Sequence, residues 1–115
     1  KLMAIMDSNT GKVVTTLPIG QGRDAAMFDP GTGLIFSSNG DGTVTVIHQE
    51  SADKYTVVEN PKTEEGARTM AVDLKTHKIF FPVGKRGPAP PATAEDPNPR
   101  GAVEPGSFHV LILGL

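Results

Sequence analysis

A repeat within the chain limits the folds that it can adopt. Residues 22–40 align with residues 66–84 without a gap, and every aligned pair lies 44 positions apart. The identical pairs are Gly22 and Gly66, Asp29 and Asp73, Thr32 and Thr76, Ile35 and Ile79, Phe36 and Phe80, and Gly40 and Gly84. Each copy contains two short apolar runs separated by a polar turn. A period of this length indicates a fold that stacks repeated groups of short elements.

Two tight turns follow each other closely in the first copy. In the segment 29–33 (DPGTG), the aspartate side chain can accept a hydrogen bond from the backbone two residues on, proline fixes φ, and glycine permits the reversal. Between the apolar runs 34–37 and 44–48, either Asn-Gly at 39–40 or Asp-Gly at 41–42 can supply the positive φ angles of a type I′ hairpin turn. Both turns predict antiparallel strands.

The apolar runs predict nine strands. The chain holds 13 glycines and 10 prolines among 115 residues, which favours many short strands joined by tight turns. The expected strands are 2–6, 12–17, 25–28, 34–37, 44–48, 55–59, 69–72, 78–81 and 108–113. A unit of four antiparallel strands in about 40–45 residues has the size of one β-propeller blade. We therefore expect an all-β fold built from propeller blades.

Several motifs resemble the YVTN-type (YncE-like) β-propeller repeat. They are Asp-Ser-Asn-Thr-Gly-Lys-Val-Val at 7–14, Gly-Gln-Gly-Arg at 20–23, Phe-Asp-Pro-Gly-Thr-Gly at 28–33 and Asn-Gly-Asp-Gly-Thr-Val-Thr-Val-Ile at 39–47. The resemblance covers almost the whole chain except residues 85–106. The chain departs from the repeat at Ser37 and Ser38, where Val-Ala or Val-Thr is usual, and at His48, where aspartate is usual.

The resemblance implies about two and a quarter four-stranded antiparallel blades of a roughly seven-bladed ring. With strands named a to d from the centre outward, residues 1–20 end one blade, 21–63 form a complete blade, and 64–115 form the last blade, which lacks strand d. We expect this chain to be the C-terminal portion of a propeller whose N-terminal blades, in the same or a nicked chain, are its partner. The resemblance also implies a bacterial protein that is periplasmic, secreted or at the cell surface, with a signal peptide outside this chain.

Residues 85–107 interrupt the repeat where the last blade should join strands b and c. This segment contains six of the ten prolines and has no hydrophobic periodicity. One interpretation is a solvated, polyproline-like loop. The other is a lid or partner-binding loop over one face of the ring, because long loops in compact domains are often functional.

The candidate ligand-binding residues are Arg23, Asp24 and Arg68. Both arginines lie just before an expected strand a, on the face where propellers commonly bind ligands. A guanidinium group there can bind an anionic partner, or it can brace adjacent blades by bonding to carbonyl groups. Asp24, next to Arg23, makes internal pairing of that arginine easy, so both interpretations stay open.

No catalytic or metal-binding residues are predicted. The three histidines do not form a metal motif, because no two are separated by two or four positions. They are His48, His77 and His109. Asp29, Asp41 and Asp73 are explained by turn formation, and neither a G-x-S-x-G motif nor a calcium loop is present.

Composition narrows the classes of function. The net charge is −2, and the absence of cysteine excludes disulfides and thiolate sites. One tyrosine, no tryptophan and no basic stripe argue against single-stranded nucleic acid, which we keep as a second alternative. We expect a non-enzymatic binding or scaffold propeller that presents a loop-lined face to a protein or small-molecule partner, with no cofactor and no membrane span. The first alternative is a propeller enzyme, lactonase-like or dependent on a quinone or metal, whose catalytic residues lie mostly outside this chain.

Overall fold

The structure is a computed structural model that describes residues 1–114, so Leu115, the last residue of the expected final blade, lies outside the described residues. Within them the chain forms nine strands and no helix, and all paired strands are antiparallel. The first sheet contains β1 (Leu2–Met6) and β2 (Val13–Pro18). The second contains β3 (Arg23–Asp29), β4 (Leu34–Asn39), β5 (Thr43–Ser51) and β6 (Lys54–Glu59). The third contains β7 (Ala71–Val72), β8 (Ile79–Val83) and β9 (His109–Leu113). The all-β prediction is confirmed.

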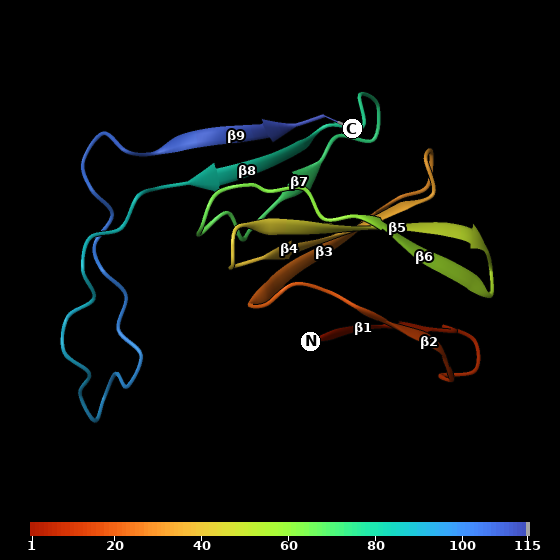
Figure 1. Cartoon of the computed structure of the whole chain (residues 1–115), viewed down its shortest axis with the longest axis horizontal. Coiled ribbons are helices and arrows are strands. Elements are labelled where there is room, and N and C mark those ends of the chain that lie inside the picture. The colour runs from red at the N-terminus through yellow and green to blue at the C-terminus, as the bar shows by residue number, and fades with distance from the viewer. Residues whose placement is uncertain (115) are drawn as a thin grey trace.

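The three sheets follow one another from the bottom to the top of Figure 1. Their connections gather at two ends. The left-hand end in Figure 1, which we call the loop face, is formed by residues 19–22, 40–42, 60–70 and 84–108. The right-hand end, which we call the turn face, is formed by residues 7–12, 30–33, 52–53 and 73–78. Every strand therefore runs between the loop face and the turn face.

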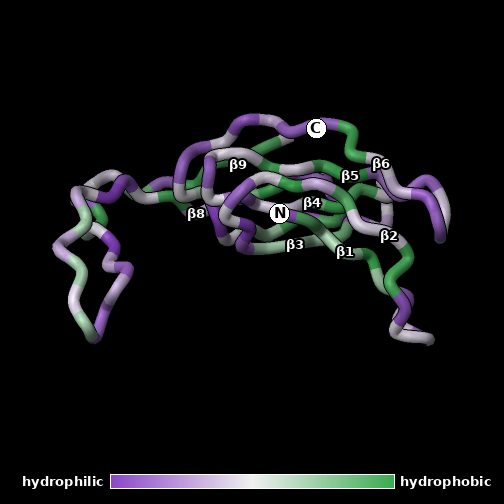
Figure 2. The backbone as a smooth tube through the Cα atoms, turned by 60° about the horizontal axis from the view of Figure 1, so that its bottom comes forward, coloured by the Kyte–Doolittle hydropathy of each residue, from purple (hydrophilic) through white to green (hydrophobic). Residues whose placement is uncertain are grey.

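The hydrophobic core lies between the second and third sheets. Its buried side chains come from alternate positions of the strands, as a two-residue period requires. They are Phe36, Val44 and Val46 of the second sheet and Ile79, Phe81 and Val83 of the third. Ala67 and Met70, from the connection between these sheets, complete the core. Figure 2 shows that hydrophobic residues follow the strands, while the tips of the turns are hydrophilic.

Equivalent positions of β4 and β8 face the preceding sheet. Ile79 and Phe81 of β8 pack against the second sheet. The positions 44 residues earlier, Ile35 and Ser37 of β4, line hollows that they share with residues of β1. Asn39 of β4 touches the segment that follows β2. The third sheet therefore stacks on the second through the same repeat positions by which the second stacks on the first.

The same aspartate turn occurs three times on the turn face. In each turn, the carboxylate Oδ1 accepts a hydrogen bond from the backbone N–H two residues on, and the residue four positions after the aspartate has a positive φ. The aspartates are Asp7, Asp29 and Asp73, and the residues with positive φ are Gly11, Gly33 and His77. The bond predicted for the 29–33 turn is confirmed, with Gly31 N 3.0 Å from Asp29 Oδ1.

The type I′ turn predicted between β4 and β5 is wrong. Asn39 pairs with Thr43, so the loop has three residues, and only Gly42 among them has a positive φ, of 87°. Asp41 supplies the physical reason. Its Oδ1 accepts hydrogen bonds from the Thr43 hydroxyl at 2.6 Å and from the Thr43 N–H at 3.1 Å, which stabilises the longer loop.

The strand predicted at 69–72 is shorter in the structure. Only Ala71–Val72 is extended and paired, opposite residues 79–80 of β8. Continuing this register would place Thr69 opposite Pro82, which has no N–H to donate. We attribute the early end of the ladder to Pro82.

Candidate functional site

Hydrogen bonds between successive connections hold the loop face together. Gly40 N, in the β4–β5 turn, donates to the carbonyl oxygen of Gly22, in the β2–β3 connection, at 2.8 Å. Thr63 N, in the β6–β7 connection, donates to the carbonyl oxygen of Gly42 at 2.7 Å. The loop face is therefore one continuous surface that spans the sheets.

The three predicted ligand-binding residues all lie at this face. Arg23 is the exposed first residue of β3, rather than preceding the strand as predicted. A register shift between Arg23 and Ala26 interrupts the pairing of β3 next to Asp24, and such bulges redirect side chains. Asp24 Oδ1 lies 3.5 Å from Nη2 of Arg68, which precedes β7. The structure thus brings Asp24 and Arg68 together, whereas no ion pair involves Arg23 among residues 1–114.

Arg68 makes two further contacts with the second sheet. Its carbonyl oxygen accepts a hydrogen bond from the Ser38 hydroxyl of β4. Its guanidinium Nε is buried near Gly40 and has no hydrogen-bond partner within the described part of the chain. Buried donors are usually paired, so this N–H is an exception among the described residues. Arg68 therefore braces the second and third sheets through its carbonyl oxygen and its contact with Asp24.

Two hollows separate the first sheet from the second. The one at the loop face has a volume of about 170 Å³, and Arg23 and Asp24 form its charged lining. The rest of its lining comes from Leu2, Met3, Ile19, Ala25, Ala26 and Ser37. The larger hollow, of about 290 Å³, is lined mainly by apolar side chains, among them Phe28 and Ile35.

A buried polar network supports the loop face from beneath. Asn39 is fully buried, and its Nδ2 donates to the hydroxyl oxygens of Thr43 at 3.0 Å and Thr45 at 3.1 Å. Its Oδ1 accepts a hydrogen bond from the Ser37 hydroxyl at 3.2 Å. Thr45 Oγ1 also accepts from Gly20 N at 3.1 Å, which joins the network to the segment after β2. A Cβ at Gly20 would lie only 2.5 Å from Asn39 Nδ2, so this close approach requires glycine.

Asp41 connects this network to the surface. Hydrogen bonds from the Thr43 hydroxyl and from Gln21 N hold the pKa of the Asp41 carboxyl below its ordinary value of 3.8. The Gln21 N–H donates to Asp41 Oδ2 at 2.9 Å. The ionised carboxylate therefore joins the β2–β3 connection to the β4–β5 turn, in addition to shaping its own loop.

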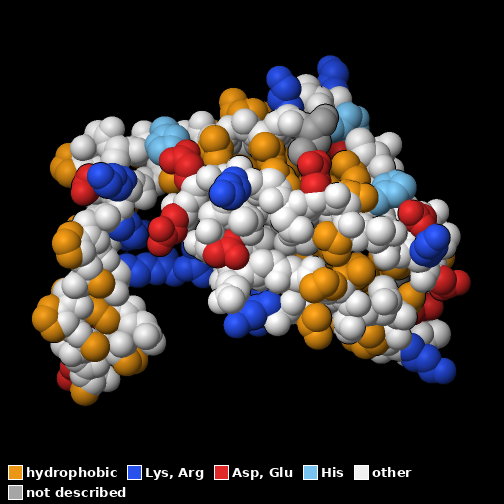
Figure 3. All heavy atoms as spheres, viewed as in Figure 1, with side chains coloured by type: hydrophobic (Ala, Val, Ile, Leu, Met, Phe, Trp, Pro, Cys, Tyr) orange, Lys and Arg blue, Asp and Glu red, His pale blue; other side chains and the backbone are white. Residues whose placement is uncertain are grey.

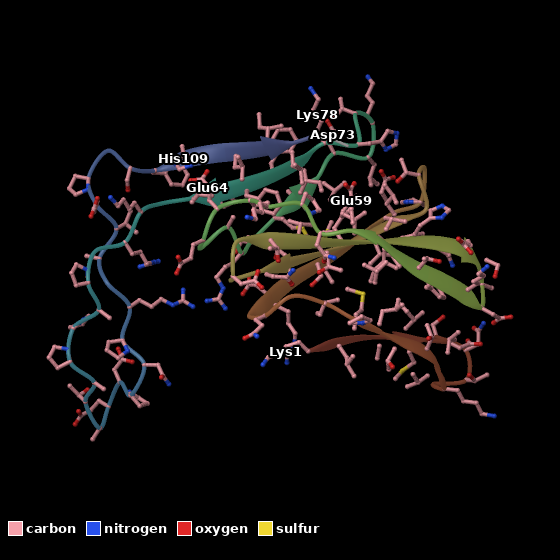
Figure 4. All side chains as sticks on the ribbon, in the orientation of Figure 1. Lys1, Glu59, Glu64, Asp73, Lys78 and His109 are labelled. Carbon is pink, nitrogen blue, oxygen red and sulfur yellow. The ribbon has the colours of Figure 1, made fainter. Side chains whose placement is uncertain are left out.

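His109 and Glu64 form a second charged contact at the loop face, and Figure 4 shows them next to each other. His109 Nδ1 lies 2.8 Å from the carbonyl oxygen of Ser107, and Nε2 lies 2.7 Å from Glu64 Oε2. A carbonyl and a carboxylate both accept hydrogen bonds, so the arrangement favours the imidazolium form, which donates from both nitrogens. The hydrogen bond to Glu64, followed by that to Ser107, raises the pKa of His109 above 6.5.

The three histidines do not form one site. His77 Nδ1 lies 2.5 Å from Oδ2 of the buried Asp29. This contact joins a turn of the third sheet to a turn of the second at the turn face. His77 has a φ of 61°, an uncommon angle for a residue with a side chain. His48 lies beside Gly33 in the second sheet. Within residues 1–114 no group of three or more histidine, aspartate or glutamate residues could hold a metal ion.

The stability of the protein is expected to fall on both sides of a pH plateau. The pKa of Asp73 is lowered by hydrogen bonds from Lys75 and Thr76, and that of Asp41 is lowered as described. Burial raises the pKa of Asp29, but hydrogen bonds from His77, Thr32 and Gly31 outweigh it, so the net pKa is below 3.8. These carboxylates stabilise the fold above pH 3.8, and that stability is lost as the pH falls through their folded-state pKa values.

The contribution of His109 to stability has the opposite dependence on pH. Its contribution is complete below pH 6.5 and is lost as the pH rises through its raised folded-state pKa. On the acidic side, the hydrogen bond from Lys54 also lowers the pKa of Glu50 from its ordinary 4.5. Thermal melts across the pH range should therefore show a plateau between pH 4.5 and 6.5. The variant His109→Gln should remove the alkaline fall. An identical alkaline slope in this variant would show that His109 does not contribute.

No family model, curated protein or solved structure matches the chain. No helix of the described residues is long and apolar enough to cross a membrane. Sequence reasoning missed the roles of Asn39 and of the pair formed by Glu64 and His109. A signal existed only for Asn39, which stands directly before a turn, whereas Glu64 and His109 are 45 positions apart.

Proposed function

We propose that the chain forms about two and a quarter blades of a YVTN-like β-propeller that binds a ligand at its loop face without chemistry of its own. The observation that carries the proposal is the repeated stacking of the sheets. β4 and β8, 44 positions apart, turn equivalent residues toward the preceding sheet. An operation that relates each sheet to the next generates further blades when it is repeated, and a ring is the closed form of such a series.

Exposed apolar side chains support further blades on both sides. On the third sheet, Val110 and Ile112 are 51% and 55% exposed, and Phe108 beside them is 67% exposed. On the first sheet, Leu2 and Met6 are 60% and 58% exposed. Among residues 1–114, β9 pairs only with β8 and β1 only with β2. Native proteins normally cover open edges and apolar patches, and we assign this cover to the remaining blades of an exported bacterial protein.

The arginine side chains at the loop face indicate the class of ligand. Arg23 is exposed beside a hollow, and its guanidinium group has no ion-pair partner among residues 1–114. The guanidinium group of Arg68 is instead paired with Asp24. Guanidinium groups match carboxylate and phosphate oxygens in geometry and charge. The proposed ligand is therefore anionic, either a small molecule or an acidic group of a protein.

Anion titration of the native particle tests this proposal. By native particle we mean this chain together with every chain that stays bound to it through purification. Its thermal melting is measured with phosphate, succinate and citrate as probes. We expect at least one probe to raise the melting temperature saturably, because a ligand at 100 times its dissociation constant adds about 2.7 kcal/mol of stability.

The variant Arg23→Ala should abolish this stabilisation. Lys12→Ala is the matched control, because it removes the same charge from the turn face, at the opposite end of the strands. If no probe raises the melting temperature, or if Arg23→Ala responds like the unmodified protein, the loop face is not an anion site.

A further inference from the structure

The connection between β8 and β9 carries a proline-rich segment away from the sheets (Figure 1). All of residues 88–98 are exposed, and they form neither strand nor helix. Their hydrogen bonds are internal, between the backbone and side chain of Thr93 and Asp96. Figure 3 shows several hydrophobic side chains among polar atoms on this projecting tip. The tip therefore exposes apolar side chains that the rest of the described chain does not cover.

Two short segments, residues 85–87 and 101–104, pair to form a neck that holds the tip. Gly87 N donates to the carbonyl oxygen of Ala102 at 2.9 Å, and Arg86 Nη1 donates to the carbonyl oxygen of Gly101 at 2.8 Å. A Cβ at Gly101 would lie 1.8 Å from the carbonyl oxygen of Gly87, so the two sides of the neck meet as closely as glycine allows. Such close backbone contact limits the movement of the neck.

Hydrogen bonds close the base of the neck and join it to the rest of the loop face. Lys85 N donates to Ser107 Oγ at 3.0 Å, and Glu104 N donates to the carbonyl oxygen of Lys85 at 2.7 Å. His109, at the start of β9, contacts both Ser107 and Glu64 of the β6–β7 connection. The neck is thereby held to β9 and to the β6–β7 connection. Binding of a partner to the tip therefore costs little entropy for ordering the neck.

We propose that residues 88–91 (Pro-Ala-Pro-Pro) are the recognition segment for a protein partner, which binds them as a polyproline II helix in an aromatic-lined groove. This inference rests on the proposed binding function and names a class of partner for the same face. Prolines fix φ near the polyproline II value, so the bound conformation is largely preformed. Aromatic-lined grooves recognise such segments in several unrelated domains.

Two other modes of binding fit the segment poorly. Three of its four residues lack an N–H, so it cannot complete the ladder of an added β-strand. The charged residues around the segment balance, with Lys85, Arg86 and Arg100 against Glu95, Asp96 and Glu104, so they do not form the basic cluster that binds anionic membranes. Lys85 lies 3.9 Å from Glu104, so its charge already has a partner within the chain. The complementary groove should therefore be basic toward Glu95 and Asp96.

Titration with polyproline-binding domains tests the inference. The native particle is titrated against a panel of fluorescently labelled SH3, WW and EVH1 domains, and binding is followed by anisotropy. We expect saturable binding by at least one domain. The double variant Pro88→Ala with Pro91→Ala should weaken that binding about tenfold or more, because both prolines contact the groove.

The double variant Pro97→Ala with Pro99→Ala is the matched control. It removes the same number of prolines beyond the Thr93–Asp96 turn, and it should change the dissociation constant by less than about twofold. Binding by no domain overturns the inference, as does equal weakening by both double variants. Binding of phosphatidylcholine–phosphatidylglycerol vesicles through the tip would also overturn it, because a membrane would then be the partner.

The outcome is independent of the anion test. If domains bind but no anion stabilises the particle, the anionic ligand is wrong and the recognition segment stands. If anions stabilise the particle but no domain binds, only the recognition segment is wrong.

Discussion

Replacing Phe36 with alanine is expected to lower the free energy of unfolding of the native particle by about 3–5 kcal/mol. Phe36 is 1% exposed and belongs to the core between the second and third sheets. Its ring packs in the same cluster as Phe81 of β8. Alanine would remove most of these contacts and leave a cavity that the rigid sheets fill only in part. Chemical denaturation, followed by a signal of tertiary structure, measures the change.

Leu74→Ala is the control for this prediction. Leu74 is 54% exposed in the turn between β7 and β8, so its truncation should alter stability by less than about 0.5 kcal/mol. If Phe36→Ala is as mild as Leu74→Ala, the second and third sheets do not share the core described here. A large effect of Leu74→Ala alone would instead place a covering partner over that turn.

Asn39→Ala should lower the free energy of unfolding by roughly 2–3 kcal/mol, the range expected when buried polar groups lose their partners. The variant removes the acceptor of the Ser37 hydroxyl and the donors to Thr43 and Thr45. All of these groups lie beneath the loop face, and Ser37 and Thr45 are at most 2% exposed. Because Thr45 also binds Gly20, the loss should loosen the contact between the first two sheets.

Asn9→Ala provides the matched control for the asparagine network. Asn9 is exposed in the β1–β2 turn, where its backbone N–H, which alanine retains, bonds to Asp7 Oδ1. Denaturation should therefore give nearly the unmodified stability for Asn9→Ala. Amide hydrogen exchange should show faster exchange at Gly20 in Asn39→Ala. Unchanged exchange at Gly20 would contradict the proposed link between the sheets.

Local chemistry made the strands predictable. The alternation of apolar residues and the Asp, Pro and Gly turns act over a few positions, so the sequence alone locates all nine strands. The turn between β4 and β5 shows the limit of this reasoning, because Asp41 bonds to Thr43 and selects a three-residue loop over the equally plausible type I′ turn. The late start of β7, at Ala71 instead of residue 69, did have a local signal, in Pro82 of the partner strand.

The contacts between sheets were not predictable in the same way. The pair formed by His77 and Asp29 joins residues 48 positions apart, and nothing in either turn by itself indicates it. Asp24 was expected to pair with its neighbour Arg23, and this is wrong, because the bulge in β3 places Asp24 near Arg68 instead. Sequence patterns identify which residues lie at an end of a sheet, whereas stacking determines which of them meet.

The mass of the native particle shows whether further blades complete this fold. Light scattering gives the mass in solution, and a denaturing gel with intact mass spectrometry identifies the chains within it. A β-propeller account predicts a particle in which further blades cover β1 and β9, with a total of roughly seven blades of about 44 residues. A lone 115-residue chain that stays monomeric at high concentration and melts sharply would contradict it, because the exposed side chains of Leu2, Phe108 and Ile112 would then need no cover.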